Sequence, residues 1–301
     1  GASIDTFALS SAGFYNPVID SFFKDSATFY IRISGGINLV EDTLTFVGLK
    51  PLNNVDVVQF FIKTSIDSAG YLSPILTNPV LYVGTPIGYV RRNGLDGYTP
   101  EFLNQQFSIV GIVTAPPYIF STTRTSMYVQ DETGGINVYY SGGFVNFKEG
   151  DLVRIRGTIL QYNGLTEISP ASSSDMVLLG EGYRIEPRIL RTGEMLSENL
   201  EGLLVQMEGT CGNTPYASGS GKAFTIYNGL SPLDVYVYNT TSIDLTPVQK
   251  GNVYRITGVV GQYDATTPYL SGYQILPRFQ SDIELIQPAI SEEVTLSLIH
   301  I

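Results

Sequence analysis

Short segments in which apolar and polar residues alternate recur along most of the chain. Between residues 105 and 180 they are separated by Gly, Asn, Asp and Pro, the residues that favour turns. Successive side chains of a strand point to opposite faces, so this alternation predicts strands with one face in a core. Five short antiparallel strands of this kind are typical of a small closed barrel. The predicted strands are Phe107–Val113, Ser126–Gln130, Gly135–Tyr140, Leu152–Leu160 and Asp175–Leu179.

The same pattern occurs twice, which indicates an internal duplication. Residues 148–163 read KEGDLVRIRGTILQYN, and residues 249–264 read QKGNVYRITGVVGQYD. A further match lies upstream, where INVY at 136–139 corresponds to VYVY at 235–238. Several short matches in one order are hard to produce by chance, so each copy is expected to form one barrel. The matched pairs include Gly150 with Gly251, Gly157 with Gly258 and Tyr162 with Tyr263.

Several motifs of the first copy resemble the OB-like domains of secreted bacterial proteins. They are YVQDETGGI at 128–136, GDLV at 150–153, GT at 157–158 and YNGLTEI at 162–168. LEGLLV at 200–205 is similar to the start of the same domain type in the second copy. Domains of this family often lie beside extracellular nuclease or lamin-tail-like modules. The resemblance covers roughly residues 105 to 287, and it implies a fold and a secreted setting rather than one function.

The expected fold class is therefore all-β, with an N-terminal β-sandwich-like domain followed by two tandem OB-type five-stranded barrels. Residues 1–103 lack the repeat, and strand-like segments separated by turns favour the sandwich there. The first barrel is expected over 104–182, and a linker turn with the second barrel over 183–288. The strand-like segments of the N-terminal domain are Phe29–Ser34, Leu44–Val47 and Val55–Lys63.

Both ends of the chain carry expectations of their own. The N-terminus begins Gly1-Ala2-Ser3 and is expected to be a mature end left after removal of a signal peptide, with artificial trimming as the alternative. Residues 289–301 are expected to form a tail. LSLIHI at 296–301 resembles a translated sequencing adapter, with a natural amphipathic strand as the alternative. The adapter interpretation leaves the natural sequence after residue 295 open.

Composition narrows the setting and the partners. The chain has 28 acidic and 17 basic residues and a net charge of −11, so it repels phosphate backbones unless its basic residues gather on one face. No apolar run approaches the roughly 18 to 20 residues that cross a bilayer, so no membrane span is expected. Cys211 is the only cysteine, which rules out a disulfide within the chain. We expect a secreted, extracellular protein.

Catalytic chemistry is largely excluded by the histidine count. His300, inside the suspected adapter, is the only histidine, so Ser-His-Asp and Cys-His nucleophilic sites and His-containing zinc sites are ruled out. Asp131-Glu132 could serve acid–base or hard-cation chemistry, but a polar hairpin loop is favoured there. GSGK at 219–222 lacks the complete phosphate-loop pattern. We expect no catalytic residue, no metal site, no cofactor and no enzymatic activity.

A candidate binding face follows from the barrel prediction. OB barrels bind across the outer face of strands two and three, and the alternation places tyrosines outward there, with an arginine on the following strand of each copy. Exposed tyrosine beside arginine suits stacking on bases or sugars, and it suits protein contacts equally well. A face without a ligand is the remaining alternative. The candidates are Tyr128, Gln130, Asn137, Tyr139, Arg154, Tyr227, Tyr236, Tyr238 and Arg255.

These features favour a non-catalytic structural subunit of an extracellular fibre, sheath or matrix. Such a subunit would self-associate through its tyrosine-rich faces and through a strand-like N-terminal arm that includes Ile4, Phe7 and Leu9. One alternative is an extracellular DNA-binding protein that coats DNA in a biofilm. The other is the non-catalytic N-terminal part of a larger secreted hydrolase or nuclease.

Overall fold

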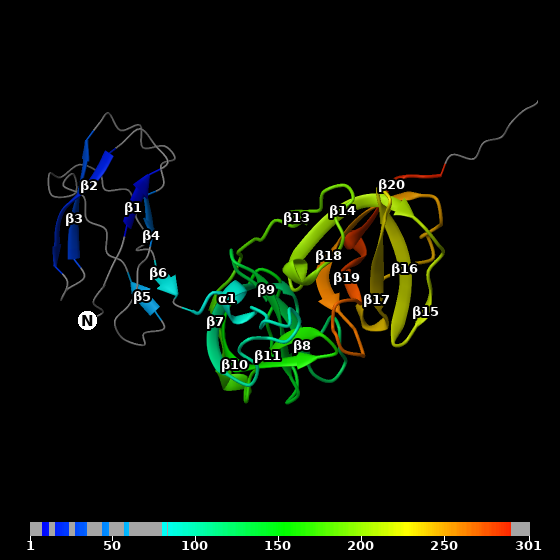
Figure 1. The fold of residues 1–301 in the computed structure, drawn as a ribbon, viewed down its shortest axis with the longest axis horizontal. Coiled ribbons are helices and arrows are strands. Elements are labelled where there is room, and N and C mark those ends of the chain that lie inside the picture. The colour runs from blue at the N-terminus through cyan, green and yellow to red at the C-terminus, as the bar shows by residue number, and fades with distance from the viewer. Residues whose placement is uncertain are drawn as a thin grey trace, which may run out of the picture. The chain divides into compact units, whose positions relative to one another are not determined.

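The chain divides into two compact units, residues 1–83 and residues 84–301 (Figure 1). The computed structural model describes residues 84–289 throughout and, within residues 1–83, the backbones of six strands. These strands form three antiparallel pairs, so the region is β-structured, and its sandwich arrangement stays a prediction. The pairs are β1 (Ala8–Ser11) with β4 (Leu44–Val47), β2 (Asn16–Phe23) with β3 (Thr28–Ser34), and β5 (Val57–Gln59) with β6 (Val80–Tyr82).

The first barrel has five strands in the spatial order β11-β9-β8-β7-β10, and pairing of β10 with β11 closes it. β9 and β11 run parallel, whereas the other neighbours are antiparallel. A Greek-key barrel of five strands with this order is an OB-type fold. β12 (Met176–Gly180) continues along the edge of β10 beyond β11. The barrel strands are β7 (Gln106–Ala115), β8 (Thr125–Gln130), β9 (Gly135–Tyr140), β10 (Leu152–Tyr162) and β11 (Leu165–Ser169).

The strand that closes the barrel differs from the sequence prediction. Asp175–Leu179, the last of the five predicted barrel strands, corresponds to β12, and the strand that closes the barrel is β11. β11 follows β10 after the two residues Asn163 and Gly164, which have φ values of 48° and 91°. Positive φ at both positions is the requirement of a tight hairpin turn, and Asn-Gly meets it.

The second barrel repeats the same topology, which confirms the duplication. Its order is β14-β16-β17-β19-β18, with β14 paired to β18 and with β17 parallel to β19. Short elements precede or flank it: β13 (Arg188–Ile189), the 3-10 turn η3 (Glu198–Leu200), β15 (Tyr216–Ser218) and β20 (Ile283–Gln287). The barrel strands are β14 (Leu204–Cys211), β16 (Gly221–Asn228), β17 (Ser231–Tyr238), β18 (Val253–Gln262) and β19 (Tyr273–Leu276).

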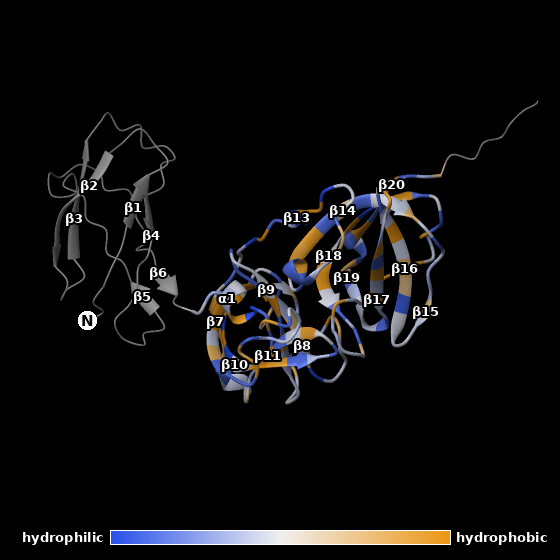
Figure 2. Ribbon diagram, viewed as in Figure 1, coloured by the Kyte–Doolittle hydropathy of each residue, from blue (hydrophilic) through white to orange (hydrophobic). Residues whose placement is uncertain are grey.

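Each barrel has its own apolar core, and Figure 2 shows the apolar positions alternating along the strands. Met127 and Ile136 of the first barrel and Phe224 and Val235 of the second point inward, as the alternation predicts. The short helix α1 (Ile87–Val90) adds Ile87 and Val90 to the first core. Residues 84–103, which the sequence places with the N-terminal domain, therefore belong to the unit that contains the barrels.

The loop between β8 and β9 anchors α1 to the first barrel. Asp131 Oδ1 accepts from the backbone N–H groups of Thr133 (2.7 Å) and Gly134 (2.9 Å), and Oδ2 accepts from that of Ile87 (2.9 Å). These three donors are backbone amides, and the Thr133 hydroxyl also donates to Oδ1 (2.6 Å). Asp131 therefore stabilises a turn and a helix start. This agrees with the hairpin interpretation of Asp131-Glu132.

A third apolar cluster joins the two barrels. It combines the outer side of β8 and the β7–β8 loop with the outer side of β14, β18 and β19. Polar contacts flank it, because Arg278 of the second barrel forms an ion pair with Glu149 of the first (2.7 Å) and Arg91 forms one with Glu201 (3.0 Å). The cluster residues are Ala115, Ile119, Phe120, Tyr128, Leu204, Val259 and Leu276.

Candidate functional site

Two residues of the predicted binding face, Tyr128 and Gln130, contact the second barrel, and a third, Asn137, is buried. Tyr128 is 2% exposed and packs edge-on against Phe120, with 5.9 Å between ring centroids. Asn137 is also buried, and Gln130 Oε1 accepts from the backbone N–H of Leu204 (2.8 Å). The outer face of β8 is thus the docking surface for the second barrel and presents little to a ligand.

Two tyrosines of β17 continue from this buried contact toward solvent. Tyr238 packs against Phe120 with 5.2 Å between ring centroids, and Tyr236 meets Tyr238 edge-on at 4.9 Å. Both β17 rings are half-buried. The Tyr236 hydroxyl donates to the backbone carbonyl of Ser218 (3.0 Å), which holds its ring against the β15–β16 hairpin.

The β7–β8 loop adds an arginine beside a third tyrosine. Arg124 is exposed, donates to the Tyr139 hydroxyl (2.5 Å) and lies over the Tyr139 ring, 5.8 Å from its centroid. The same loop is tied to the second barrel, because Thr240 Oγ1 donates to the Ile119 carbonyl (2.6 Å). The loop therefore brings first-barrel side chains to the edge of the second-barrel face.

Two more tyrosines come from the matching loops that follow β10 in the first barrel and β18 in the second. Tyr162 at the end of β10 is 62% exposed, and Tyr263 directly after β18 is 59% exposed. The two loops touch, since the Asp264 N–H donates to the Asn163 carbonyl (2.7 Å). Neither tyrosine is among the candidates from alternation, because both stand at strand ends, but the internal repeat already pairs them.

These residues fall into two groups beside the barrel contact, Arg124 with Tyr139, and Tyr162, Tyr236 and Tyr263 around Tyr238. We call the two groups together the junction surface. Burial raises the pKa of Tyr238 to about 12, and the nearby hydroxyls of Tyr236, Tyr162 and Tyr263 and the Glu167 carboxyl contribute. Tyr238 therefore stays a neutral phenol at physiological pH. The junction surface consists of Arg124, Tyr139, Tyr162, Tyr236, Tyr238 and Tyr263.

Glu167 of β11 lies at the base of the junction surface. It is paired in register with Asn137 of β9 and is 8% exposed. Burial alone raises its pKa to about 7. Its carboxyl accepts no hydrogen bond and has no counter-ion among residues 84–289, which distinguishes it from the other buried acids near the barrel contact.

The remaining candidates lie elsewhere on the barrels. Arg255 forms ion pairs with Glu208 (2.6 Å) and Glu284 (2.7 Å), so its charge is compensated. Tyr227 lies beside the β16–β17 turn, at the opposite end of that hairpin from Tyr238. Arg154 lies in β10 between β7 and β12. From the predicted set the structure brings together Tyr236 and Tyr238, and Tyr139 lies beside Arg124.

A buried polar network fixes the two barrels on another side of the contact. Arg91 Nη2 contacts both Glu201 Oε1 and Glu198 Oε1 at 3.0 Å, and the Tyr273 hydroxyl donates to Glu198 Oε2 (3.0 Å). Burial raises the pKa of Glu201 to about 8, while Arg91 acts in the opposite direction. The network joins the barrels through these contacts, although Arg91 Nε and Glu201 Oε2 are buried in it without a hydrogen-bond partner among the described residues.

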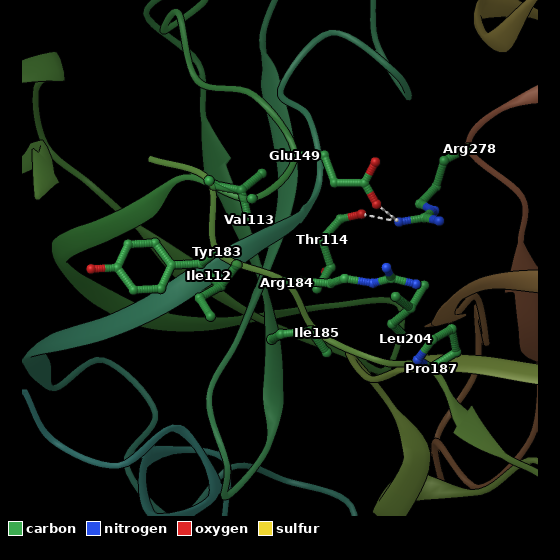
Figure 3. A pocket seen from close by; sticks show the side chains of 12 residues that line it. Ile112, Val113, Thr114, Glu149, Tyr183, Arg184, Ile185, Pro187, Leu204 and Arg278 are labelled. Carbon is green, nitrogen blue, oxygen red and sulfur yellow. Dashed lines mark hydrogen bonds and ion pairs between the residues drawn. The ribbon is translucent and has the colours of Figure 1, made fainter. Parts of the chain in front are cut away.

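A separate cavity of about 470 Å³ lies between β7, the linker over 182–187 and the second barrel (Figure 3). Figure 3 shows Arg278 reaching Glu149 and Thr114 at its wall, with Arg184 alongside. Both arginines are already paired, Arg278 with Asp282 and Glu149 and Arg184 with Glu186. The cavity therefore offers no uncompensated charge to a ligand.

Two further observations concern the described part of the chain. It holds no group of His, Cys, Asp and Glu side chains that could bind a metal ion. No helix in it is long and apolar enough to cross a membrane.

Comparison with known proteins gives one relative by sequence. No family model matches the chain. The chain is 32% identical over 197 residues to Endonuclease YhcR of Bacillus subtilis (strain 168). The match covers 62% of this chain and 16% of that protein, so the chain spans about a sixth of the relative's length.

Similar solved structures include single and tandem barrels. An OBody bound to hen egg-white lysozyme is 20% identical, with a TM-score of 0.28 over 35% of this chain and 100% of that one. A murine DNA-binding protein bound to double-stranded DNA is 14% identical, with a TM-score of 0.31 over 62% and 98%. The single-stranded DNA-binding protein of Thermus aquaticus is 14% identical, with a TM-score of 0.21 over 64% and 98%. The OB assignment of this chain rests on its own strand order.

Proposed function

We propose that the two barrels are the non-catalytic, single-strand-binding part of a larger secreted nuclease, and that nucleic acid lies across the junction surface. One observation carries the proposal: four tyrosines from both barrels, Tyr162, Tyr236, Tyr238 and Tyr263, lie close together at the barrel contact. Arg124 and Tyr139 add a second pair from a first-barrel loop and strand, and that loop is tied to the second barrel. Base–aromatic stacking contributes about 1–3 kcal/mol per base and tolerates any sequence.

The positions of these residues within the fold support the proposal. OB barrels bind oligonucleotides with strands two and three and with the loops after strands one and four. Tyr139 lies on the third strand of the first barrel, and Tyr236 and Tyr238 on that of the second. Arg124 lies in the loop after a first strand, and Tyr162 and Tyr263 stand at the loops after the fourth strands.

Charge favours single strands over duplex DNA. The net charge is −11, and Arg124 is the only cation of the junction surface, so few phosphates are neutralised there. Duplex binding depends mainly on phosphate contacts, whereas single strands also offer unstacked bases. We therefore expect binding led by stacking, with a weak dependence on salt.

The nuclease context is supported by the relative. Endonuclease YhcR is named as a nuclease, and most of its length lies outside the match. This chain has one histidine, His300, outside the described residues. We place catalysis in a part of the longer protein that the barrels do not supply, so that their role is to hold the strand.

The fibre hypothesis has less support within the described residues. Ile4 and Phe7 of the expected assembly arm lie outside them, and Leu9 lies in β1, which pairs with β4 of the same chain. Three of the tyrosines expected to mediate self-association, Tyr139, Tyr236 and Tyr238, belong to the junction surface. Protein contact and nucleic-acid contact are therefore competing uses of one surface.

Fluorescence anisotropy with a labelled oligothymidine of about 15 nucleotides, at about 50 mM salt, tests the proposal. We expect the chain to bind it more tightly than a duplex of equal length. Tyr162→Ala and Tyr263→Ala should each weaken binding about tenfold, through the loss of one stacking contact. Tyr227→Ala, an exposed tyrosine of the second barrel away from the surface, is the matched control. No binding, or equal losses for Tyr227→Ala, would refute the proposal.

A further inference from the structure

Glu167 is a buried carboxyl group without a hydrogen-bond donor in the described part of the chain. It is more than nine-tenths buried, lies beneath the tyrosines of the junction surface, and receives no hydrogen bond from residues 84–289. A buried polar group without a partner costs free energy, and a charged one costs more. This carboxyl is therefore free to accept hydrogen bonds from a partner that arrives from outside.

None of the donors around Glu167 forms a hydrogen bond to its carboxyl within residues 84–289. In the parallel pairing of β9 with β11 its neighbour is Asn137, whose side-chain Oδ1 is buried without a partner. Asn137 uses its Nδ2 on Ser126 Oγ (3.4 Å). Asn137 Oδ1 and Thr166 Oγ1 are inaccessible to solvent, whereas the Glu167 oxygens keep some solvent contact. The carboxyl therefore remains in reach of a ligand on the junction surface.

The donor pattern of the bases selects one ligand. An ionised carboxylate offers two acceptor oxygens side by side. Guanine carries two adjacent donors on its Watson–Crick edge, N1–H and N2–H. Adenine and cytosine pair one donor with an acceptor on that edge, and thymine places its single donor between two acceptors. Guanine is therefore the only one of the four bases that can donate a hydrogen bond to each carboxylate oxygen without placing one of its own acceptors against an oxygen.

We propose that Glu167 selects guanine in a single strand held on the junction surface, its two carboxylate oxygens accepting from guanine N1–H and N2–H. This inference rests on the proposed function. It requires a single strand, because the Watson–Crick edge is occupied in a duplex. The Glu167 carboxyl raises the pKa of both Tyr128 and Tyr238, which places these two hydroxyls near it.

Near neutral pH, Glu167 is the group whose change of charge should alter how a base is bound, because the tyrosines around it stay neutral. Tyr128 from β8 and Tyr238 from β17 both have raised pKa values and remain neutral there. Tyr162, Tyr236 and Tyr263 lie beyond Tyr238. Glu201, which also faces Tyr128, has a pKa of about 8 and is paired with Arg91. Above about pH 7 Glu167 presents two acceptors, and below it one donor and one acceptor, which no longer match guanine.

The test compares thymidine oligomers of about 15 nucleotides with variants that carry one central dG, dA or dC. At about pH 8 the full chain should bind the dG oligomer about tenfold more tightly than the others. Glu167→Gln should lose this preference and keep its affinity for all-thymidine oligomers, since the tyrosines are unchanged. Glu181→Gln, which removes an exposed carboxylate from the linker, is the matched control and should keep the preference.

Two further measurements keep the outcome decisive. The guanine preference of the unmodified chain should fade as the pH drops to about 6, and Glu167→Asp, which keeps the charge but shortens the reach, should weaken it. Equal affinity for all four oligomers, or a preference that survives in Glu167→Gln, would overturn this inference and leave the proposed function standing. Absence of binding to every oligomer would remove both.

Discussion

At the scale of single residues, Glu167 shows how burial controls a charge. Its folded pKa, about 7, lies above the ordinary value of 4.5, so folding favours the protonated form. The stability that this carboxyl contributes is complete below about pH 4.5 and is lost as the pH rises to about 7. A pKa difference of one between the folded and unfolded states is worth about 1.4 kcal/mol, so the loss is on the order of 3 kcal/mol.

Replacement of Glu167 by Gln should remove this pH dependence. We expect Glu167→Gln to be more stable than the unmodified chain at about pH 8 and of similar stability at about pH 4.5. Urea unfolding followed by circular dichroism at both pH values gives the comparison. Glu201, with a pKa of about 8, also lowers the stability of both proteins as the pH rises. The effect of Glu167 is therefore measured as the difference in unfolding free energy between the unmodified chain and Glu167→Gln at each pH. Parallel pH profiles would show that Glu167 is already solvated in the folded state.

The same residue scale explains why the binding face could be predicted only in part. Alternation assigns Tyr128 and Tyr139 to the outer side of neighbouring strands, and both assignments are correct for their own barrel. Tyr128 is nevertheless buried, because the second barrel covers that part of the outer side, while Tyr139 stays half-exposed. A period of two distinguishes inside from outside, and it carries no information about which outer residues another domain will cover.

At the scale of elements, the start of β9 lies against the turn after η3. Gly135 and Gly202 approach so closely that a Cβ on either would collide with the carbonyl group of the other, and Gly202 also has a φ of +80°. Only glycine accommodates this contact between the first barrel and the entry to the second. The contact explains the second Gly of the motif DETGG, which the hairpin turn alone does not require.

Gly135→Ala should therefore destabilise the protein by more than about 2 kcal/mol, since backbone atoms, not a flexible side chain, must move. Thermal unfolding measures the effect. Gly94→Ala is a suitable comparison, because a Cβ at Gly94 meets only ordinary van der Waals contacts, and it should change stability little. Equal effects of the two substitutions would mean that the approach of β9 to the η3 turn is not tight in solution.

The elements also show which parts of the fold the sequence determines. β8, β9, β16 and β17 follow from alternation because each fills a local core. β11 is short, and only two residues, Asn163 and Gly164, separate it from β10. Alternation therefore does not identify β11 as a separate strand, although Asn163-Gly164 marks the turn. Tyr162 and Tyr263 are not predicted from alternation either, because they lie at the ends of strands. The internal repeat, which pairs the two positions, is the sequence signal that identifies them.

At the scale of the whole molecule, the two barrels share a core. Seven residues from both barrels form the third apolar cluster, and Phe120 and Tyr128 are its first-barrel aromatic members. Large aromatic side chains contribute most to such contacts, and their truncation typically costs about 3–5 kcal/mol. Because the cluster belongs to both barrels, a change in the first should destabilise the second. The junction surface depends on the same contact, since its tyrosines come from both sides.

Cys211 provides a probe of this coupling. It is the only cysteine, and it is buried in the core of the second barrel, so a thiol reagent modifies it only when that barrel opens. We expect Phe120→Ala, a change in a first-barrel loop, to accelerate modification of Cys211 in native buffer about tenfold or more, as a loss of at least 1.4 kcal/mol requires. Leu178→Ala, at an exposed position of β12 outside the shared cluster, should leave the rate unchanged. If Phe120→Ala also leaves it unchanged, the barrels open independently, and a surface built from both could not hold a strand in one fixed geometry.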